Sequence, residues 1–176
     1  MSSQYPLFQF LENNKAQKGG PHTHTSMGKP FGSFNITDDK LTEFYELYKN
    51  HIADHNQAHI IEKHKSQCSV LVDIDFKFKN DITDRQYTET HIYNLVDIYN
   101  EAIKSVVNIN NESRDLIAFV FQKSKPYLSN ETIKDGIHII YPSIITTPDA
   151  QYAIRDMVIS KINENNIFDD IPYIND

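Results

Sequence analysis

The sequence predicts an α+β fold in which a small N-terminal α/β unit precedes a sheet of the split βαβ, ferredoxin-like type. A length of 176 residues with 39% hydrophobic residues allows one globular domain or two small lobes. From residue 69 onward, apolar residues follow the order strand, helix, strand, strand, helix, which is the split βαβ pattern without its final strand. We expect residues 1–66 to form the N-terminal unit and residues 67–176 the incomplete sheet domain.

The N-terminal unit is predicted to be built around one helix. Residues 1–32 are polar and interrupted by glycine and proline, so an irregular segment is expected there. Short strands are expected at 33–36 and 59–62, on either side of a helix over 40–48. The residues of this helix at buried, helical spacing are Leu41, Phe44, Tyr45 and Tyr48.

The strand at residues 69–78 is the clearest element of the sheet domain. Its side chains alternate between an apolar face and a face that carries Leu71, Asp73, Asp75 and Lys77. In the split βαβ order the first and third strands are central neighbours, so these carboxylates and His138 can share one open face. The other predicted elements are a helix over 84–107, strands at 116–122 and 136–141, and a helix from the cap Thr147 to about 163.

Composition and charge limit the classes of function. Cys68 is the only cysteine, which excludes an intramolecular disulfide and a multi-thiolate zinc cluster. No apolar run approaches the ~20 residues of a membrane span and the N-terminus lacks the layout of a secretory signal, so we expect an intracellular protein without a membrane partner. The net charge of −7 argues against a simple nucleic-acid-coating protein, but a metal-dependent enzyme must concentrate carboxylates.

Asp73 and Asp75 form the strongest candidate site. Two aspartates two residues apart on a strand point the same way, and like charges this close repel one another unless a cation lies between them. The alternative is a strand that simply exposes two acids to water. Because the other face of the strand is strongly apolar and the strand is expected to be internal to the sheet, we predict a divalent-metal site. Oxygen-only ligands favour Mg²⁺ or Mn²⁺ over zinc.

A second constellation lies in the run Lys134-Asp135-Gly136-Ile137-His138. Gly136 leaves room for a ligand to lie against the backbone, His138 can hydrogen-bond a phosphate, and Lys134 can supply positive charge. A strand histidine is more often structural than functional. Its expected position opposite the Asp pair favours the functional interpretation.

These two motifs resemble those of the archaeo-eukaryotic primase (AEP) superfamily, and in particular the primase-polymerase domains of eukaryotes and of the primase-helicases of large nucleocytoplasmic DNA viruses. The first family motif, Asp-x-Asp or Asp-x-Glu on a hydrophobic strand, is matched by Asp73 and Asp75. The second, Ser-x-His, is matched by Gly136 and His138 with glycine in place of serine, and the family lysine four residues before the histidine is matched by Lys134. The resemblance extends over most of the chain from about Pro21.

The third family motif, a further acidic ligand on the last strand of the sheet, has no convincing match. Asp169, Asp170 and Asp176 lie near the expected place, but the first two are interpreted as a solvated cluster after a helix and the third as a chain end. We therefore expect the chain to be part of a longer protein, weakly active or inactive by itself.

The resemblance implies an RRM-like catalytic sheet and a DNA primase or primase-polymerase that works by two-metal phosphoryl transfer. It implies that Asp73 and Asp75 bind Mg²⁺ or Mn²⁺, and that Lys134 and His138 bind the phosphates of an NTP or dNTP. The implied partners are a single-stranded DNA template and a C-terminal helicase domain. For a viral protein, the host cytoplasm or nucleus is the implied compartment.

Two other functions stay open from the sequence. A phosphotransferase of the haloacid-dehalogenase type also carries Asp-x-Asp, but it expects threonine or valine where this chain has Lys77, together with a parallel sheet. A non-catalytic module could bind single strands or recruit a helicase through exposed aromatic residues on its sheet.

Other residues are weaker candidates, each with a structural alternative. His22 and His24 could form half of a metal site, although a loop or a substrate contact is favoured. Lys123 and Lys125 could contact a phosphate or template backbone, but such lysines usually belong to a solvated turn. Arg85, at the start of the predicted helix, is undecided.

Overall fold

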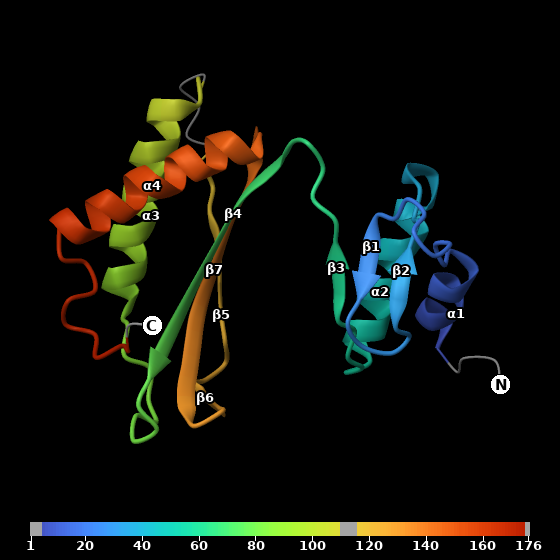
Figure 1. Cartoon of the computed structure of the whole chain (residues 1–176), viewed down its shortest axis with the longest axis horizontal. Coiled ribbons are helices and arrows are strands. Elements are labelled where there is room, and N and C mark those ends of the chain that lie inside the picture. Colours follow the sequence, from blue (N-terminus) through green and yellow to red (C-terminus); the bar gives the residue numbers. More distant parts are fainter. Residues whose placement is uncertain (1–4, 110–115, 175–176) are drawn as a thin grey trace. The chain divides into compact units, whose positions relative to one another are not determined.

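The computed structural model describes residues 5–109 and 116–174 (Figure 1). The chain divides into two compact units, Met1–Lys65 and Ser66–Asp176, and each is described by itself. Helices and antiparallel sheets are mixed in the chain, which confirms the predicted α+β class. Within the described residues, no helix is both long and apolar enough to cross a membrane.

The first unit packs helices against a small antiparallel sheet. The strand order is β2-β1-β3, and one core holds the unit together. The elements of this unit are α1 (Pro6–Asn13), β1 (His24–Ser26), β2 (Gly32–Phe34), the 3-10 turn η1 (Asp38–Lys40), α2 (Leu41–Ala53) and β3 (Ile60–Glu62). The core residues are Leu7, Phe10, Leu11, Phe34, Ile36 and Phe44.

The segment over residues 1–32, predicted to be irregular, is irregular only in part, and the prediction is wrong for Pro6–Asn13 and His24–Ser26. It contains α1, whose Leu7, Phe10 and Leu11 lie at helical spacing and are buried. It also contains β1, which carries His-Thr-Ser and has no apolar alternation, but which is held by pairing with β2 on one side and β3 on the other. Backbone pairing of this kind leaves no hydrophobic signal in the sequence.

Helix α2 was predicted over 40–48 and extends to Ala53. Its buried residues are Phe44 and His51, which lie two turns apart on one stripe. Tyr45 was predicted to be buried and is half-exposed, because it lies beside that stripe rather than on it.

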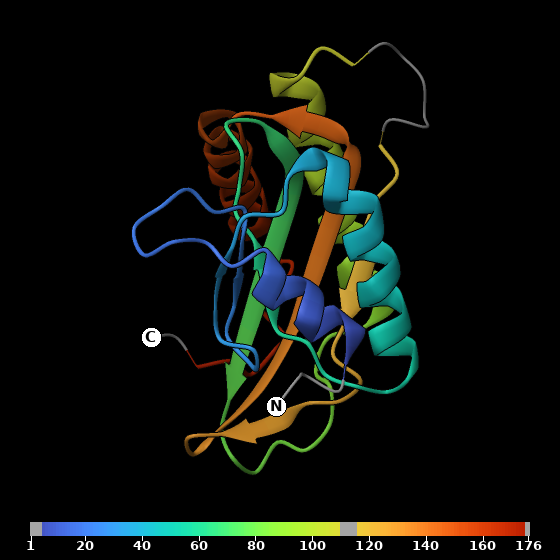
Figure 2. The same ribbon diagram turned by 90° about the vertical axis from the view of Figure 1, so that its right-hand side faces the viewer.

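The second unit is a sheet with two helices on one face. The strand order is β4-β7-β5 with antiparallel neighbours, and a short strand pairs with the beginning of β7. Figure 2 shows β4 and β7 side by side along their length. The elements are β4 (Cys68–Phe78), α3 (Glu89–Val106), β5 (Phe119–Gln122), β6 (Tyr127–Ser129), β7 (Thr132–Thr146) and α4 (Pro148–Glu164).

One face of this sheet is buried and the other is open. Helices α3 and α4 cover the buried face (Figure 1). Among the fully buried side chains of this core are Val70, Phe78, Leu95, Ile103, Ile137, Ile139, Tyr141 and Ile154. The alternation predicted for the first strand is confirmed, because Val70, Val72 and Phe76 are buried while Asp73 and Asp75 are exposed.

The position of β4 in the sheet differs from the prediction. Among the described residues β4 pairs only with β7, so it forms an edge of the sheet instead of an internal strand. The segment after α4 reaches this strand, because the Ile174 N–H donates a hydrogen bond to the Lys77 carbonyl at 2.7 Å.

Strand β7 is much longer than the predicted 136–141. The pairing register with β4 shifts between Ser69 and Val70, and the resulting irregularity in β7 contains Pro142. The predicted strand ended at Tyr141, immediately before the proline. In the structure a bulge accommodates Pro142, and the strand continues to Thr146.

Both helices of the second unit begin at capping residues. The hydroxyl of Thr147 accepts a hydrogen bond from the Ala150 N–H, and Pro148 follows at the first helical position, as predicted. Helix α3 begins at Glu89 instead of 84, with Thr88 and His91 forming a capping box. The preceding residues stay non-helical while Arg85 and Tyr87 contact β7.

Candidate metal and nucleotide site

The open face of the sheet carries the two predicted aspartates. Asp73 and Asp75 alternate with inward-facing residues of β4, so both carboxylates point away from the core. Their side chains are 62% and 63% exposed. Across the strand pair, Asp73 lies opposite His138 of β7 and Asp75 lies opposite Gly136. The structure therefore brings both predicted motifs to adjacent positions on one face.

His138 contacts the first aspartate directly. Its Nδ1 lies 3.0 Å from Oδ1 of Asp73, and about half of the imidazole is exposed. The contact is an ion pair when the ring is protonated and a hydrogen bond when Nδ1 of the neutral ring carries its proton. In either state, both side chains remain about half-exposed or more on the open face.

Gly136 is a site of close packing. A Cβ built on this residue would lie 2.8 Å from the Ile74 carbonyl oxygen and 3.1 Å from Oδ1 of Asp75. The absence of a side chain thus lets the backbone of β7 and the second carboxylate approach one another. The space at Gly136 that the sequence predicted for a ligand is in part the space that Asp75 needs.

Lys134 lies on the same face as His138, four residues away and ~13 Å along the strand. It is paired with Lys77 of β4 on one side and with Tyr127 of β6 on the other. Lys134 therefore lies closer to the β6–β7 turn than His138 does, and it is not directly opposite either carboxylate.

Lys123 is closer to the aspartates than Lys134. Its Nζ lies 3.7 Å from Oδ1 of Asp75 and 4.8 Å from the centre of the Tyr127 ring. Sequence reasoning favoured a solvated turn for this residue, whereas the side chain is only 27% exposed. Lys125, two residues further on, is exposed as that interpretation expected.

Asp135 was missed as a site-supporting residue. It is fully buried on the core face of β7, where Arg85 binds both oxygens, at 2.9 Å from Nε and 3.2 Å from Nη2. The Gly136 N–H donates a further hydrogen bond to Oδ1 at 2.9 Å. A charged residue at an inward position of an otherwise apolar strand was the available signal. Arg85, undecided from the sequence, is its partner.

Burial and charge at this pair shift the pKa values of Arg85 and of the neighbouring Tyr87. The hydrogen bond to Asp135 raises the pKa of Arg85 above its ordinary value. Burial, with a smaller contribution from the Asp135 charge, raises the pKa of Tyr87 to about 12. Tyr87 stays protonated and donates a hydrogen bond to the Gly136 carbonyl at 3.0 Å. The buried cluster thus fixes the backbone of β7 directly beneath the carboxylate face.

Comparison with known proteins identifies the family. The sequence model described as the C962R protein N-terminal AEP domain matches residues 23–176. The chain belongs to this AEP family. Membership agrees with the resemblance drawn from the two motifs, and it indicates a primase-type domain from a family that uses divalent metals.

The AEP domain is similar to three viral proteins. It is 37% identical over 163 residues to "Putative helicase L207/L206" of Acanthamoeba polyphaga mimivirus, covering 92% of this chain. It is 26% identical to "Putative helicase 184R" of Invertebrate iridescent virus 6 and to "Putative helicase 121R" of Invertebrate iridescent virus 3, covering 86% and 90% of this chain. The chain spans 17% of the length of each relative.

The donor groups of the AEP domain fit part of a divalent-metal site. Two exposed carboxylates on one face are the oxygen ligands that Mg²⁺ and Mn²⁺ prefer. Within residues 5–109 and 116–174, however, His, Cys, Asp and Glu side chains form no group of three or more that could hold a metal. Asp73 and Asp75 therefore supply two ligands, and the described residues show no third.

The acids considered for a third ligand lie elsewhere. Asp170 binds His91, whose Nε2 lies 3.0 Å from Oδ1, while Nδ1 of the same ring accepts a hydrogen bond from the Thr88 N–H. Asp170 thus ties the segment after α4 to the start of α3. Asp169 is exposed beside it, and Asp176 lies outside the described residues.

His24 is part of the first unit's interior. It is buried, its ring centre lies 4.9 Å from that of Phe44, and its Nδ1 is 2.9 Å from the Thr23 hydroxyl. Burial lowers the pKa of His24, and the charge of Glu62 opposes that shift only in part. A neutral ring packed on Phe44 accounts for this histidine without a metal, so the His22-x-His24 hypothesis receives no support from the structure.

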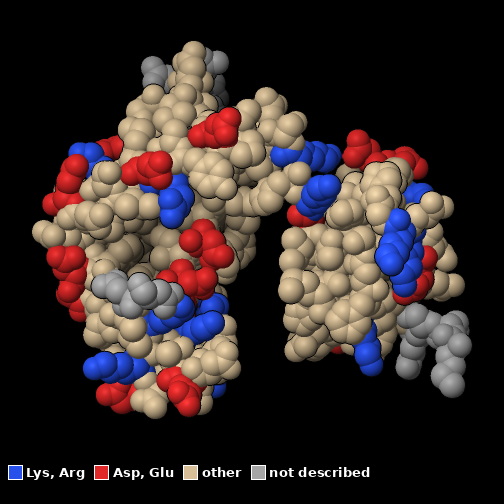
Figure 3. Space-filling view, in the orientation of Figure 1, with Lys and Arg blue, Asp and Glu red and all other residues tan. Residues whose placement is uncertain are grey.

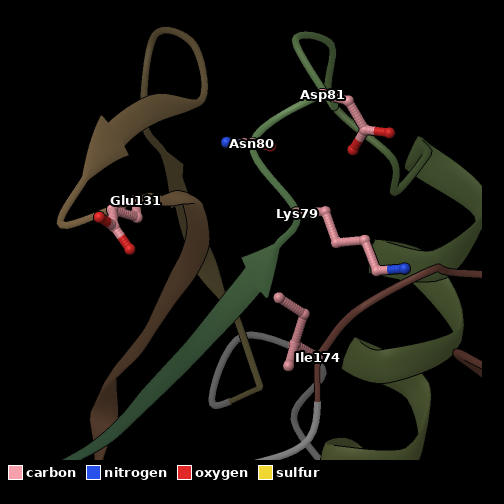
Figure 4. A pocket seen from close by; sticks show the side chains of 5 residues that line it. All are labelled: Lys79, Asn80, Asp81, Glu131 and Ile174. Carbon is pink, nitrogen blue, oxygen red and sulfur yellow. The ribbon is translucent and has the colours of Figure 1, made fainter.

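The surface has two further features. Acidic and basic side chains are interspersed on the visible face of both units (Figure 3). A pocket of about 440 Å³ is lined by residues that follow β4, by the β6–β7 turn and by the segment after α4 (Figure 4). The lining residues are Lys79, Asn80, Asp81, Glu131 and Ile174.

Proposed function

We propose that this AEP domain is the catalytic domain of a DNA primase or primase-polymerase, which performs template-directed nucleotidyl transfer by a two-metal mechanism. The observation that carries the proposal is the 3.0 Å contact between His138 and Asp73, with Asp75 beside them on the same open face. This arrangement joins the two motifs that are 63 residues apart in the sequence and specific to the family's chemistry.

We also propose that the second unit is an RRM-like sheet. The order β4-β7-β5 corresponds to the first, third and second strands of the split βαβ pattern, with α3 between the first two strands and α4 after the third. The hydrogen bond from Ile174 to Lys77 supports this assignment, because a fourth strand of that pattern would lie beside the first. On this basis residues 1–66 and 67–176 are the two parts of the catalytic domain.

Each site residue has a proposed role. Asp73 and Asp75 would hold divalent cations, which when bound polarise the transferred phosphoryl group and offset the charge on the leaving pyrophosphate. His138 and Lys134 bind phosphate oxygens of the incoming NTP or dNTP. The 3′-oxygen of the growing strand bonds to the α-phosphorus while the bond to pyrophosphate breaks, so no nucleophile from the protein is required.

The proposed partners follow from the reaction and from the relatives. A single-stranded DNA template is required for directed synthesis. Because the three similar viral proteins carry "helicase" in their names and are much longer than this chain, we propose that a helicase region accompanies the domain in the full-length protein.

One observation favours a second function, that of a non-catalytic single-strand binder. Phe119 and Phe121 of β5 are half-exposed on the open face, and Phe121 lies opposite His138. Exposed aromatic rings on a sheet can stack on bases. The haloacid-dehalogenase alternative is not favoured, since the observed sheet is antiparallel where that fold requires parallel strands.

Nucleotide incorporation distinguishes these functions. We would follow incorporation on single-stranded DNA templates, with and without a primer, in Mn²⁺ or Mg²⁺, for the wild-type chain and for the double variant Asp73→Asn/Asp75→Asn. Asp156→Asn, which neutralises an exposed acid on α4, is the matched control. We expect metal-dependent incorporation, weak in absolute rate, that the double variant loses and the control keeps.

A measurement of template binding gives the result that would contradict this proposal. Strand affinity that is the same with and without Mn²⁺, and unchanged in Asp73→Ala, would contradict the catalytic proposal and favour the single-strand binder. Incorporation that survives in the double variant would place the metal ligands elsewhere.

A further inference from the structure

Lys123 reaches across the central strand of the sheet to the second carboxylate. It follows β5 directly, and β5 and β4 lie on opposite sides of β7. Because neighbouring strands are ~4.8 Å apart, the backbones of β5 and β4 are separated by ~10 Å. The lysine nevertheless brings its Nζ to 3.7 Å from Oδ1 of Asp75. The Lys123 side chain therefore extends over β7 instead of into solvent.

Gly136 lies at the point of β7 where Lys123 and Asp75 meet. Lys123 Nζ lies 3.7 Å from the position that a Cβ on Gly136 would occupy, and that Cβ would also lie 3.1 Å from Oδ1 of Asp75. A larger side chain at position 136 would occupy the space in which ammonium and carboxylate meet. The glycine in the Gly-x-His motif and the lysine that follows β5 are therefore neighbours at the second carboxylate.

The backbone of Lys123 is also held in place. Arg85 donates through Nη2 to the Lys123 carbonyl and through Nη1 to Oε1 of Gln122 at 2.6 Å. The same guanidinium is held by the buried Asp135. With its backbone fixed and its ammonium packed near the Tyr127 ring, Lys123 loses less conformational freedom on binding an anion than a lysine in a solvated turn would.

We propose that Lys123 is a third phosphate-binding cation of the nucleotide site, in addition to Lys134 and His138. This inference rests on the proposed function, because it places the phosphates of a nucleoside triphosphate above Gly136, between the carboxylate pair and the lysines. Lys123 is the cation nearest to that position, and its contact with Asp75 keeps it there before a nucleotide binds.

Nucleotide binding without a template tests this role. The dissociation constant of a dNTP and of inorganic tripolyphosphate would be measured in Mn²⁺ for the wild-type chain, Lys123→Met, Lys123→Arg and Lys125→Met. We expect Lys123→Met to weaken both ligands about tenfold or more, because a charge-assisted phosphate contact is lost. Lys123→Arg should restore most of the affinity, and Lys125→Met should leave it unchanged.

The outcomes separate this inference from the proposed function. Wild-type affinity in Lys123→Met, or an equal loss in Lys125→Met that would indicate general charge only, overturns the role of Lys123 and leaves the proposed function standing. Failure of the wild-type chain to bind either ligand overturns both. Thermal melting of each variant checks that the fold is kept, and Lys123→Met retains the aliphatic stem that lies over β7.

Discussion

Asp135 is a fully buried carboxylate whose charge is compensated by one guanidinium. A buried ion pair adds little net stability over an apolar pair, but removing one partner leaves an uncompensated charge in the interior. Here the partner, Arg85, also binds Gln122 and Lys123, so the pair connects the segment before α3 with β5 and β7. Its effect on stability and its effect on the site are therefore linked.

Arg85→Ala is expected to lower the free energy of unfolding by about 2–4 kcal/mol, because Asp135 would lose its counter-charge while remaining buried. Urea denaturation measures the change. Arg155→Ala removes an arginine from an exposed pair with Asp156 and should change stability by less than about 0.5 kcal/mol. Adding Asp135→Asn to Arg85→Ala should recover part of the loss. Equal effects for Arg85→Ala and Arg155→Ala would show that the pair is not buried as described.

The neutral state of buried His24 predicts a pH dependence of the first unit's stability. Its pKa is lower in the folded than in the unfolded chain, so the unfolded state binds a proton first as the pH falls below about 6.5. Stability is then full above that pH and decreases until the lowered folded-state pKa is reached. Hydrogen exchange of β1–β3 amides between pH 7.5 and 5 should show this decrease, and it should flatten in His24→Gln but not in His22→Gln. An unchanged slope in His24→Gln would refute the assignment.

The antiparallel pair of β4 and β7 positions the candidate site. Sequence alternation predicted which residues of both strands face outward, since period 2 determines the face of every side chain once the strand is recognised. It could not predict that Lys123 crosses the sheet, because that contact depends on the pairing of β5 with β7 and on the anchoring of its backbone by Arg85. It also missed β1 and the bulge at Pro142, which depend on backbone pairing and leave no apolar pattern.

Gly136→Ala is expected to destabilise the β4–β7 pair by about 1–3 kcal/mol, because the new methyl group would lie 2.8 Å from the Ile74 carbonyl oxygen and the strands must shift. Urea denaturation gives the magnitude. Ser143→Ala, an exposed position in the same strand, is the control and should be close to neutral. A neutral Gly136→Ala would show that the close approach of the two strands is not a constraint.

At the scale of the molecule, the buried apolar residues that the structure describes form two cores that share no residue. Composition and length left open whether one domain or two lobes would form, because the apolar content is the same in either case. Family membership could be inferred from the five residues that match the two motifs and the family lysine, since their spacing on two strands is specific. The third acidic ligand could not be inferred, and the described residues do not supply it.

Separate cores predict separate responses to core truncation. Leu11→Ala in the first unit and Leu95→Ala in the second should each lower the stability of their own unit by about 2–5 kcal/mol, because both side chains are fully buried. Hydrogen exchange followed by mass spectrometry would localise the loss. Each variant is the control for the other, and a loss of protection in both units from either change would contradict independent cores.

The metal-binding role of the carboxylate pair is tested most directly by Mn²⁺ titration of the isotope-labelled chain, with paramagnetic broadening of backbone amide resonances as the readout. The account predicts that broadening begins at residues 72–76 and 136–138 and is lost in Asp73→Asn/Asp75→Asn. Broadening that is centred on Asp169 and Asp170, or that persists unchanged in the double variant, would contradict it.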